Sequence, residues 1–224
     1  MPFRFKTILL NLALLIAIAS GVEAAERSIR ILALGDSLTS GYGLPNGAAF
    51  PDVLQRALNT QHVNVTVINA GVAGDTSSDG LARLDWTLSD PKSMPDAAIV
   101  ELGANDALRG LSPAQMERNL DAILAKLKMR NIPVLLAGMK SPRNLGPAYA
   151  TEYDAVFARL SKKYNTLLYP FFLDGVVLDR ALIQPDGLHP NARGLDVIVK
   201  NITPSVIKLM QQVSAKTTGG QSAR

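Results

Sequence analysis

The sequence predicts an α/β protein: a three-layer α/β/α sandwich on a doubly wound, five-stranded parallel sheet. Short apolar runs alternate along the chain with longer segments of helical periodicity, as strand–helix–strand units do. The 224 residues suit one domain with its own hydrophobic core and are few for two. No internal repeat or linker interrupts the pattern. We therefore expect a single domain over residues 25–213.

Five apolar runs are expected to form the strands. They lie at residues 29–34, 63–68, 97–102, 133–139 and 166–169. The first is rich in isoleucine and leucine, and the second alternates valine with polar residues before it becomes fully apolar. Helices between the strands favour a parallel sheet with right-handed crossovers, which is what makes it doubly wound.

Five segments with helical periodicity separate or follow these strands. They are residues 48–58, 77–88, a stretch that begins after Ser112, 147–164, and 191 to about 213. Ser112 and Gln115 resemble a capping box, with proline in the first turn of the helix they open. Pro204 is expected to kink or break the last helix. The small, polar residues 214–224 are expected to form a flexible tail.

The first 24 residues resemble an export signal. Arg4 and Lys6 precede an apolar run at residues 8–19, and small residues near Ala24 permit cleavage after it. A membrane anchor is the alternative, but a span needs about 20 apolar residues and this run has about a dozen. We expect a signal peptide, 1–24, and a mature chain without an integral membrane span in the periplasm or outside the cell.

Composition excludes several classes of function. The chain has no cysteine, which excludes disulfides, thiol catalysis, cysteine-ligated zinc and a lipoprotein-type anchor. The formal net charge is +4 and the basic residues are scattered, so nucleic acid is not an expected partner. Almost half of the residues are apolar, which excludes a disordered chain.

Three loops that follow predicted strands carry candidate functional residues. Such loops meet at the carboxyl edge of a parallel sheet, where ligands bind. After the first strand, Gly35 allows a tight turn that exposes Ser37, although Asp36 and Ser37 would also serve as helix N-caps. Gly74 offers a backbone N–H near a helix start, and Asn105 an uncharged donor; both suit an oxyanion. Each could equally belong to an ordinary turn.

Asp186 and His189 follow the fifth strand. Residues three apart in a turn have close backbones, so the carboxylate can reach one ring nitrogen and leave the other free as a base. The alternative is a turn in which Pro190 opens the last helix. The only other histidine, His62, is expected on the surface at the opposite edge. If Ser37 needs an imidazole, only His189 can supply it. All these candidate residues fall on loops at the same edge of the sheet, which coincidence explains poorly.

The chain resembles the GDSL/SGNH hydrolases in four blocks that occur in the same order. They are Gly35-Asp36-Ser37-Leu38, Gly74, Gly103-Ala104-Asn105-Asp106 and Asp186-Gly187-Leu188-His189-Pro190. Over nearly all of the mature chain it looks like the bacterial periplasmic thioesterase I/protease I/lysophospholipase group, which includes arylesterases. The resemblance implies a flavodoxin-like SGNH fold, Ser37 as nucleophile, His189 as base and Asp186 as the acid that orients it. It also implies an oxyanion hole formed by Ser37, Gly74 and Asn105.

Two positions depart from the family pattern. Ala104 replaces a glycine often seen before the asparagine, which should be tolerated if the backbone φ there is ordinary. Ser141 stands where an apolar residue is expected, in a loop that shapes the acyl site of the family. A preference for long acyl chains is therefore not implied.

The expected reaction is hydrolysis of carboxylic esters and thioesters through an acyl-enzyme on Ser37, with no metal or cofactor. Acyl-CoA thioesters, lysophospholipids and aryl esters are the substrates that the resemblance implies. Leu108, Leu111 and Leu145 either line an acyl groove or cover the core. The alternatives are a carbohydrate or peptidoglycan O-acetylesterase and a non-catalytic exported binding module on the same fold. We expect a monomer that acts on small molecules.

Overall fold

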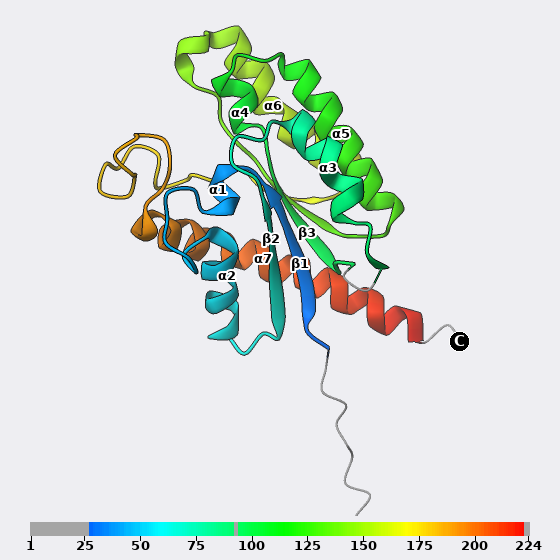
Figure 1. Cartoon of the computed structure of the whole chain (residues 1–224). Coiled ribbons are helices and arrows are strands. Elements are labelled where there is room, and N and C mark those ends of the chain that lie inside the picture. The colour runs from blue at the N-terminus through cyan, green and yellow to red at the C-terminus, as the bar shows by residue number, and fades with distance from the viewer. Residues whose placement is uncertain (1–26, 92–93, 222–224) are drawn as a thin grey trace, which may run out of the picture.

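The computed structural model describes residues 27–91 and 94–221, and its five strands form one sheet (Figure 1). The strands are β1 (Ile29–Gly35), β2 (Val65–Gly71), β3 (Ala97–Glu101), β4 (Val134–Ala137) and β5 (Leu167–Tyr169). Their order is β2-β1-β3-β4-β5, and every adjacent pair is parallel. The predicted doubly wound, five-stranded parallel sheet is confirmed. The predicted signal peptide lies outside the described residues.

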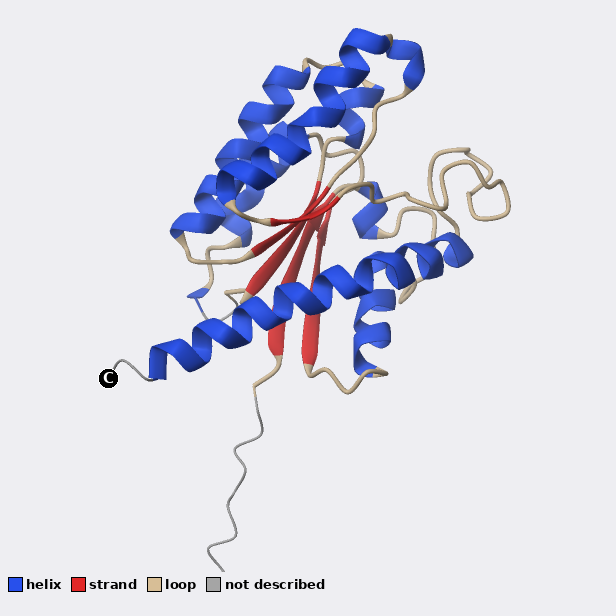
Figure 2. Ribbon diagram, turned by 180° about the vertical axis from the view of Figure 1, so that it is seen from behind, coloured by secondary structure: helices blue, strands red, loops and turns tan. Residues whose placement is uncertain are grey.

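Helices cover both faces of the sheet, which gives three layers (Figures 1 and 2). One face carries α2 (Phe50–Asn59) and α7 (Ala192–Gln221), which contact each other. The other carries α3 (Ser77–Thr87), α5 (Pro113–Met129) and α6 (Pro147–Tyr164). Short elements lie in the loops that follow strands: α1 (Ser37–Ser40), α4 (Ala104–Leu108) and the 3₁₀ turn η2 (Arg143–Leu145). Within the described residues, no helix is long and apolar enough to cross a membrane.

The hydrophobic core is centred on the middle strands. β3 and β4 are buried at every position, and β1 is buried from Ile31 onward. The edge strands β2 and β5 are only partly buried. Central strands covered by helices on both faces are expected to be apolar throughout, as these are, apart from Arg30 near the start of β1 and Glu101 at the end of β3. The loops of the carboxyl edge are therefore held by a rigid sheet.

The last helix differs from the prediction. Pro204 lies inside α7 without ending it, and the helix continues past the predicted end near Val213 to Gln221. Pro204 faces solvent, so the carbonyl that loses its N–H partner can be hydrated, while Ile202 and Val206 on the inner side stay buried. The residues from 214 to Gln221, predicted as part of a tail, are helical.

The predicted capping box at α5 is wrong. Ser112 precedes the helix, but its side chain makes no capping hydrogen bond, and the Gln115 side-chain amide donates to Asn119. The reciprocal pair occurs at the start of α3. There the Thr76 hydroxyl accepts from the Asp79 N–H, and the Asp79 carboxylate accepts from the Thr76 N–H.

Candidate active site

Ser37 stands on a turn that depends on two glycines. β1 ends at Gly35, which pairs with Gly71 at the end of β2, and α1 begins two residues later at Ser37. A Cβ on Gly71 would lie 2.4 Å from the Ser40 nitrogen and 2.9 Å from the Asp36 carbonyl oxygen. Only glycine therefore lets α1 pack this closely on the strand ends. The close turn places Ser37 at the carboxyl edge of the sheet.

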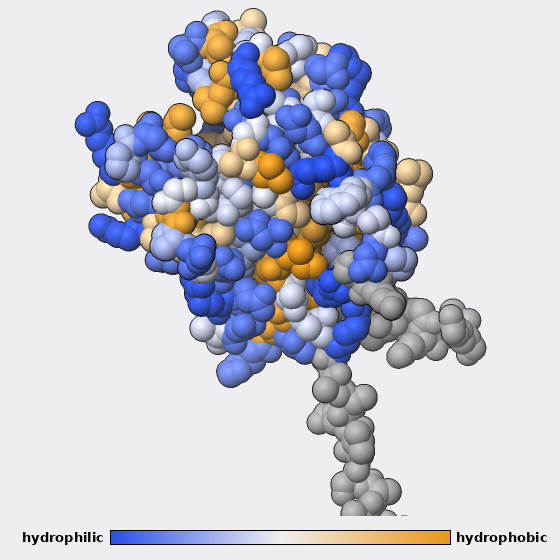
Figure 3. All heavy atoms as spheres, in the orientation of Figure 1, coloured by the Kyte–Doolittle hydropathy of each residue, from blue (hydrophilic) through white to orange (hydrophobic). Residues whose placement is uncertain are grey.

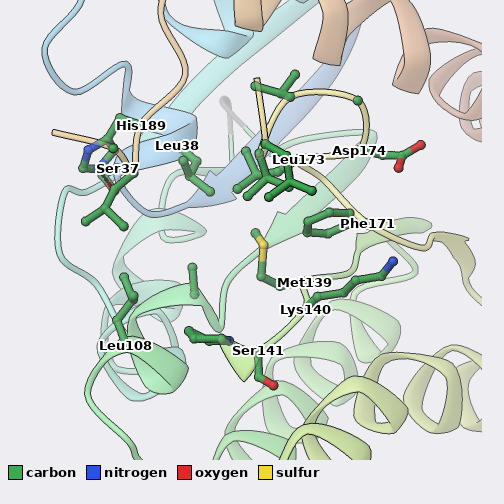
Figure 4. Close-up of a pocket in the computed structure, with 18 of the residues that line it drawn as sticks. Ser37, Leu38, Leu108, Met139, Lys140, Ser141, Phe171, Leu173, Asp174 and His189 are labelled. Atoms are coloured by element: carbon green, nitrogen blue, oxygen red, sulfur yellow. Dashed lines mark hydrogen bonds between the residues drawn. The ribbon is translucent and has the colours of Figure 1, made fainter. Parts of the chain in front are cut away.

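His189 lies between Ser37 and Asp186, as the sequence predicts. Its Nε2 is 2.9 Å from the Ser37 Oγ, and its Nδ1 is 2.7 Å from the Asp186 Oδ2. Figure 4 shows the imidazole beside the serine at one end of a cavity. In this geometry the carboxylate fixes the ring, and Nε2 faces the hydroxyl whose proton a base would remove. His62 is exposed in the loop between α2 and β2, as expected.

The turn that carries Asp186 also stabilises its charge. The other carboxylate oxygen accepts from the backbone N–H groups of Leu188 and His189, at 2.9 and 3.0 Å. These two bonds, with the imidazole, lower the pKa of Asp186 to about 2. Gln184 anchors the loop: its side chain donates to the Tyr42 carbonyl, and its N–H donates to the His189 carbonyl. The Tyr42 ring lies 4.8 Å from the His189 ring, centroid to centroid.

Asn105 occupies the first turn of α4. Its Nδ2 lies 3.1 Å from the Asp36 Oδ2 and 3.0 Å from the Asp75 carbonyl oxygen. Gly103 takes the positive φ, 121°, that the entry to α4 requires, so Ala104 is tolerated at an ordinary φ. Gly74, at φ 89°, lies in the loop after β2, and its carbonyl accepts from Arg109. The three residues predicted to form an oxyanion hole thus occupy the loops after β1, β2 and β3.

Comparison with known proteins agrees with this geometry. A model of the GDSL-like lipase/acylhydrolase family matches residues 33–197, which include Ser37, Gly74, Asn105, Asp186 and His189. The chain belongs to this family. Its relatives include Esterase TesA of Pseudomonas aeruginosa, which is 34% identical over 92% of this chain and all of that protein. Thioesterase 1/protease 1/lysophospholipase L1 of Escherichia coli K12 is 40% identical over 72% of this chain and 75% of that one.

A solved structure supports the same assignment. The SGNH-hydrolase family esterase AlinE4 matches with a TM-score of 0.70 and 47% identity, over 81% of this chain and 96% of its own. At that identity the likeness covers both fold and family. Within the described residues of this GDSL-like acylhydrolase, no cluster of three or more histidine, aspartate or glutamate side chains could hold a metal ion.

Two buried carboxyl groups lie beneath the nucleophile: Asp36, expected from the sequence only as a helix cap, and Glu101, which belongs to no sequence motif. Asp36 accepts from the Leu38 N–H as the N-cap of α1, so the capping interpretation of Asp36 also holds. Glu101, in β3, accepts from the Thr39 hydroxyl at 2.8 Å. Burial raises the pKa of Asp36 to about 6, and burial followed by the nearby Asp36 charge raises that of Glu101 well above its usual value. A glutamate inside an otherwise apolar strand was the signal that could have identified the pair.

A second group of polar side chains connects the loops that carry the predicted oxyanion donors. The Asp106 carboxylate accepts from both the N–H and the hydroxyl of Ser77, at 2.8 and 2.6 Å, which ties α4 to the start of α3. Arg83 pairs with Asp75 at 2.6 Å and donates to the Gly35 carbonyl. These contacts fix the loop of Gly74 relative to the strand that precedes Ser37. They depend on distant parts of the sequence, so local motifs gave no indication of them.

A cavity of about 960 Å³ opens beside Ser37, Asn105 and His189 (Figure 4). Its middle is lined by apolar side chains, among them Leu38, Met139, Phe171 and Leu173. The charged Lys140 and Asp174 lie at the end far from the imidazole.

The predicted substrate-binding leucines divide into two groups. Leu108 lines this cavity, whereas Leu111 and Leu145 do not. Leu111 lies beyond α4, where its carbonyl accepts from Tyr149, and Leu145 belongs to η2. Ser141 lines the cavity and is buried, and its hydroxyl has no hydrogen-bond partner in the described part of the chain.

Proposed function

We propose that this chain hydrolyses carboxylic esters and thioesters by acyl transfer to Ser37. The observation that carries the proposal is the contact of 2.9 Å between the Ser37 Oγ and the His189 Nε2, with Asp186 on the opposite ring nitrogen. Relatives of the same family named esterase, thioesterase and lysophospholipase support the substrate class. A binding module without catalysis would not require this alignment.

The proposed reaction has two half-steps. His189 removes the hydroxyl proton through Nε2 while the Ser37 Oγ attacks the carbonyl carbon, and Asp186 stabilises the resulting imidazolium. The amides of Ser37 and Gly74 and the Asn105 side chain hold the oxyanion. The imidazolium then protonates the departing alcohol or thiol. A water molecule repeats the sequence on the acyl-enzyme, releases the acid and restores the hydroxyl.

The cavity favours a substrate with an acyl chain longer than acetyl. Its middle section is apolar, so a hydrocarbon chain placed there leaves water for a hydrophobic surface, which stabilises binding by about 0.8 kcal/mol per buried methylene. An O-acetylesterase binds only an acetyl group, which is too short to occupy that apolar section. The charged far end, with Lys140 and Asp174, sets a polar limit to the apolar section, which favours short to medium acyl chains over long ones.

We further propose export and action as a monomer on small-molecule substrates. The support is the sequence: a basic start, an apolar run and small residues before Ala25, with no basic cluster suited to nucleic acid. Sequencing of the N-terminus of exported material tests the cleavage, with Ala25 as the expected first residue.

The central test compares Ser37→Ala with Ser40→Ala, a neighbouring serine of the same short helix. Ser37→Ala should lower kcat for p-nitrophenyl esters roughly 10³-fold or more and abolish labelling by a fluorophosphonate, with an unchanged far-UV circular dichroism spectrum. Ser40→Ala should retain both activity and labelling. A p-nitrophenyl ester series from acetyl to long chains, beside acyl-CoA and lysophospholipid, identifies the preferred acyl group. A folded Ser37→Ala protein with near-normal rates would exclude the proposed nucleophile.

A further inference from the structure

Exposed hydrophobic side chains gather in the loops at the carboxyl edge of the sheet, where the cavity opens. We call this set the apolar rim: Tyr42, Val72, Leu108, Leu111, Val177, Leu178 and Leu188. Leu178 is the most exposed, at 95%. Among the exposed large hydrophobic side chains of residues 27–91 and 94–221, only Trp86 and Met129 lie elsewhere, on α3 and α5. Scattered exposed hydrophobics need no explanation, but a group around one opening marks an interaction surface.

The rim is continuous with the cavity. Leu108, Val177, Leu178 and Leu188 also line the cavity, so the apolar surface runs from its interior to the outside. In Figure 3, hydrophobic atoms lie on both sides of the hollow between the part that carries α4 and the loop before α7. Any partner that covers the rim therefore faces the entrance through which an acyl chain must pass.

The form of the rim excludes a helix or a strand as its natural partner. Its members come from the separate loops after β1, β2, β3 and β5, so they form neither a continuous strand edge nor a single helix face. Side chains spread over several loops beside a cavity suit a broad, deformable surface. A protein or a second copy seated on this rim would also close the entrance.

Charge does not dominate this part of the surface. The exposed basic residues of these loops are Arg109, Lys140, Arg143 and Arg180, and the exposed acidic residues are Asp174, Asp179 and Asp186. Arg143 also pairs with Asp154 of α6. The charges balance, so neither nucleic acid nor a strongly acidic protein is favoured, and attachment has to come from apolar side chains.

We propose that the apolar rim docks on the surface of a phospholipid bilayer, from which acyl substrates enter the cavity. The docking stands on the exposed side chains and the entry of substrate rests on the proposed function. Exposed leucine and valine side chains that enter the boundary between headgroups and acyl chains gain free energy in proportion to the apolar area they bury. Because charges are balanced, the bilayer does not have to be anionic.

The experiment measures flotation of the mature Ser37→Ala protein with phosphatidylcholine vesicles, so that binding is measured without turnover. We expect co-flotation that persists in 1 M salt, where the Debye length is about 3 Å. Leu178→Asp should weaken partition roughly tenfold or more, and Val72→Asp with Leu111→Asp by a similar factor. Trp86→Asp and Met129→Asp, which change exposed side chains away from the rim, should bind as the parent does.

Several outcomes would overturn the proposal. They are the absence of flotation, equal losses in the rim and control variants, and binding that requires anionic lipid and disappears in salt. A concentration-dependent dimer in analytical ultracentrifugation that Leu178→Asp abolishes would assign the rim to a second copy instead. The proposed function is tested separately on the parent protein with Ser37 intact: a parent that floats but hydrolyses no ester would contradict acyl transfer and leave the docking intact. An active enzyme that does not float would contradict the docking and leave acyl transfer intact.

Discussion

Asp186 and Asp36 are both close to the serine–histidine pair, and their surroundings give them opposite electrostatic properties. Asp186 lies in an exposed turn, accepts two backbone N–H bonds and one from the imidazole, and has its pKa lowered to about 2. Asp36 is fully buried next to Glu101, and burial raises its pKa to about 6. The same carboxyl group is thus stabilised as an anion in one loop and destabilised in the other.

These different surroundings determine what each aspartate can contribute to the site. The Asp186 anion is held by the backbone whatever the state of the ring, so it is ready to stabilise an imidazolium. Asp36 forms no ion pair among the described residues. Its carboxylate accepts from the Leu38 N–H and the Asn105 side-chain amide, and a smaller electrostatic stabilisation comes from His189. Its contribution is therefore geometric: it holds the Asn105 amide and the first turn of α1 in place.

The largest effect on kcat is expected from a substitution of Asp186, the exposed aspartate. Asp186→Asn keeps the size of the side chain and an oxygen for the two backbone N–H groups, but it removes the charge and can place an N–H against the ring. The imidazole should then adopt the wrong tautomer, and kcat for p-nitrophenyl esters should fall roughly 10³- to 10⁴-fold. Steady-state kinetics on the folded variant measure the loss.

Asp179→Asn is the matched control, because Asp179 lies in the same exposed segment and accepts a backbone N–H from Ala181. It should leave kcat almost unchanged. An Asp186→Asn enzyme within a factor of ten of the parent would mean that His189 needs no acid to orient it.

A smaller loss of kcat is expected when the buried Asp36, or the Asn105 side chain that it contacts, is changed. Asn105→Ala should lower kcat roughly 10²- to 10³-fold, as the loss of one oxyanion donor does. Asp36→Asn should act through Asn105, because it sets an amide donor against the Asn105 Nδ2, now 3.1 Å from the Asp36 Oδ2. We expect a loss of kcat of roughly tenfold or more with little change in KM.

The double variant decides between positioning and a general loss of stability. If Asp36 works through Asn105, Asp36→Asn should cost little once Asn105 is alanine, because interacting residues are not additive. Fully additive losses in kcat, measured beside the midpoint of urea unfolding for all three proteins, would contradict a positioning role.

The sequence predicted the sheet and the contacts among the candidate catalytic residues because local signals carry both. Apolar runs and helical periodicity depend on neighbouring residues, and each strand and helix that they predicted occurs, with shifted ends. The short helices α1 and α4 were not predicted. Ser37, Asp186 and His189 follow strand ends, and the rule that such loops meet at one edge brings them together. Pro204 shows a limit: its local effect on the backbone is outweighed by the buried apolar face of α7.

The supporting contacts could not be predicted in the same way. The bonds from Ser77 to Asp106, from Arg83 to Gly35 and from Gln184 to Tyr42 join residues far apart in the sequence. No periodicity or turn motif encodes them. The same is true of which leucines line the cavity: Leu108 and Leu111 are three residues apart, yet only Leu108 does so.

The smallest expected effect concerns Glu101, the buried neighbour of Asp36, and the pH dependence of the free energy of unfolding. Burial raises the pKa of Glu101, so above its unfolded pKa the folded protein keeps a proton that the unfolded chain has lost. The free energy of unfolding therefore falls as the pH rises through that window. Glu101→Gln keeps an acceptor for the Thr39 hydroxyl and cannot ionise. Relative to the parent, the stability of the variant should rise with pH above the unfolded pKa, with a slope of at most about 1.4 kcal/mol for each pH unit.

Urea unfolding at several pH values measures this difference, and Glu117→Gln is its control. The contact with Arg159 lowers the pKa of Glu117, so its contribution is complete above the unfolded pKa and is lost only at lower pH. Its curve should therefore run parallel to that of the parent from pH 5 to 8, while the Glu101→Gln curve diverges. If the Glu101→Gln curve were also parallel, Glu101 would ionise in the folded protein as readily as in the unfolded chain. The contrast between exposed and buried carboxylates would then lose its energetic basis.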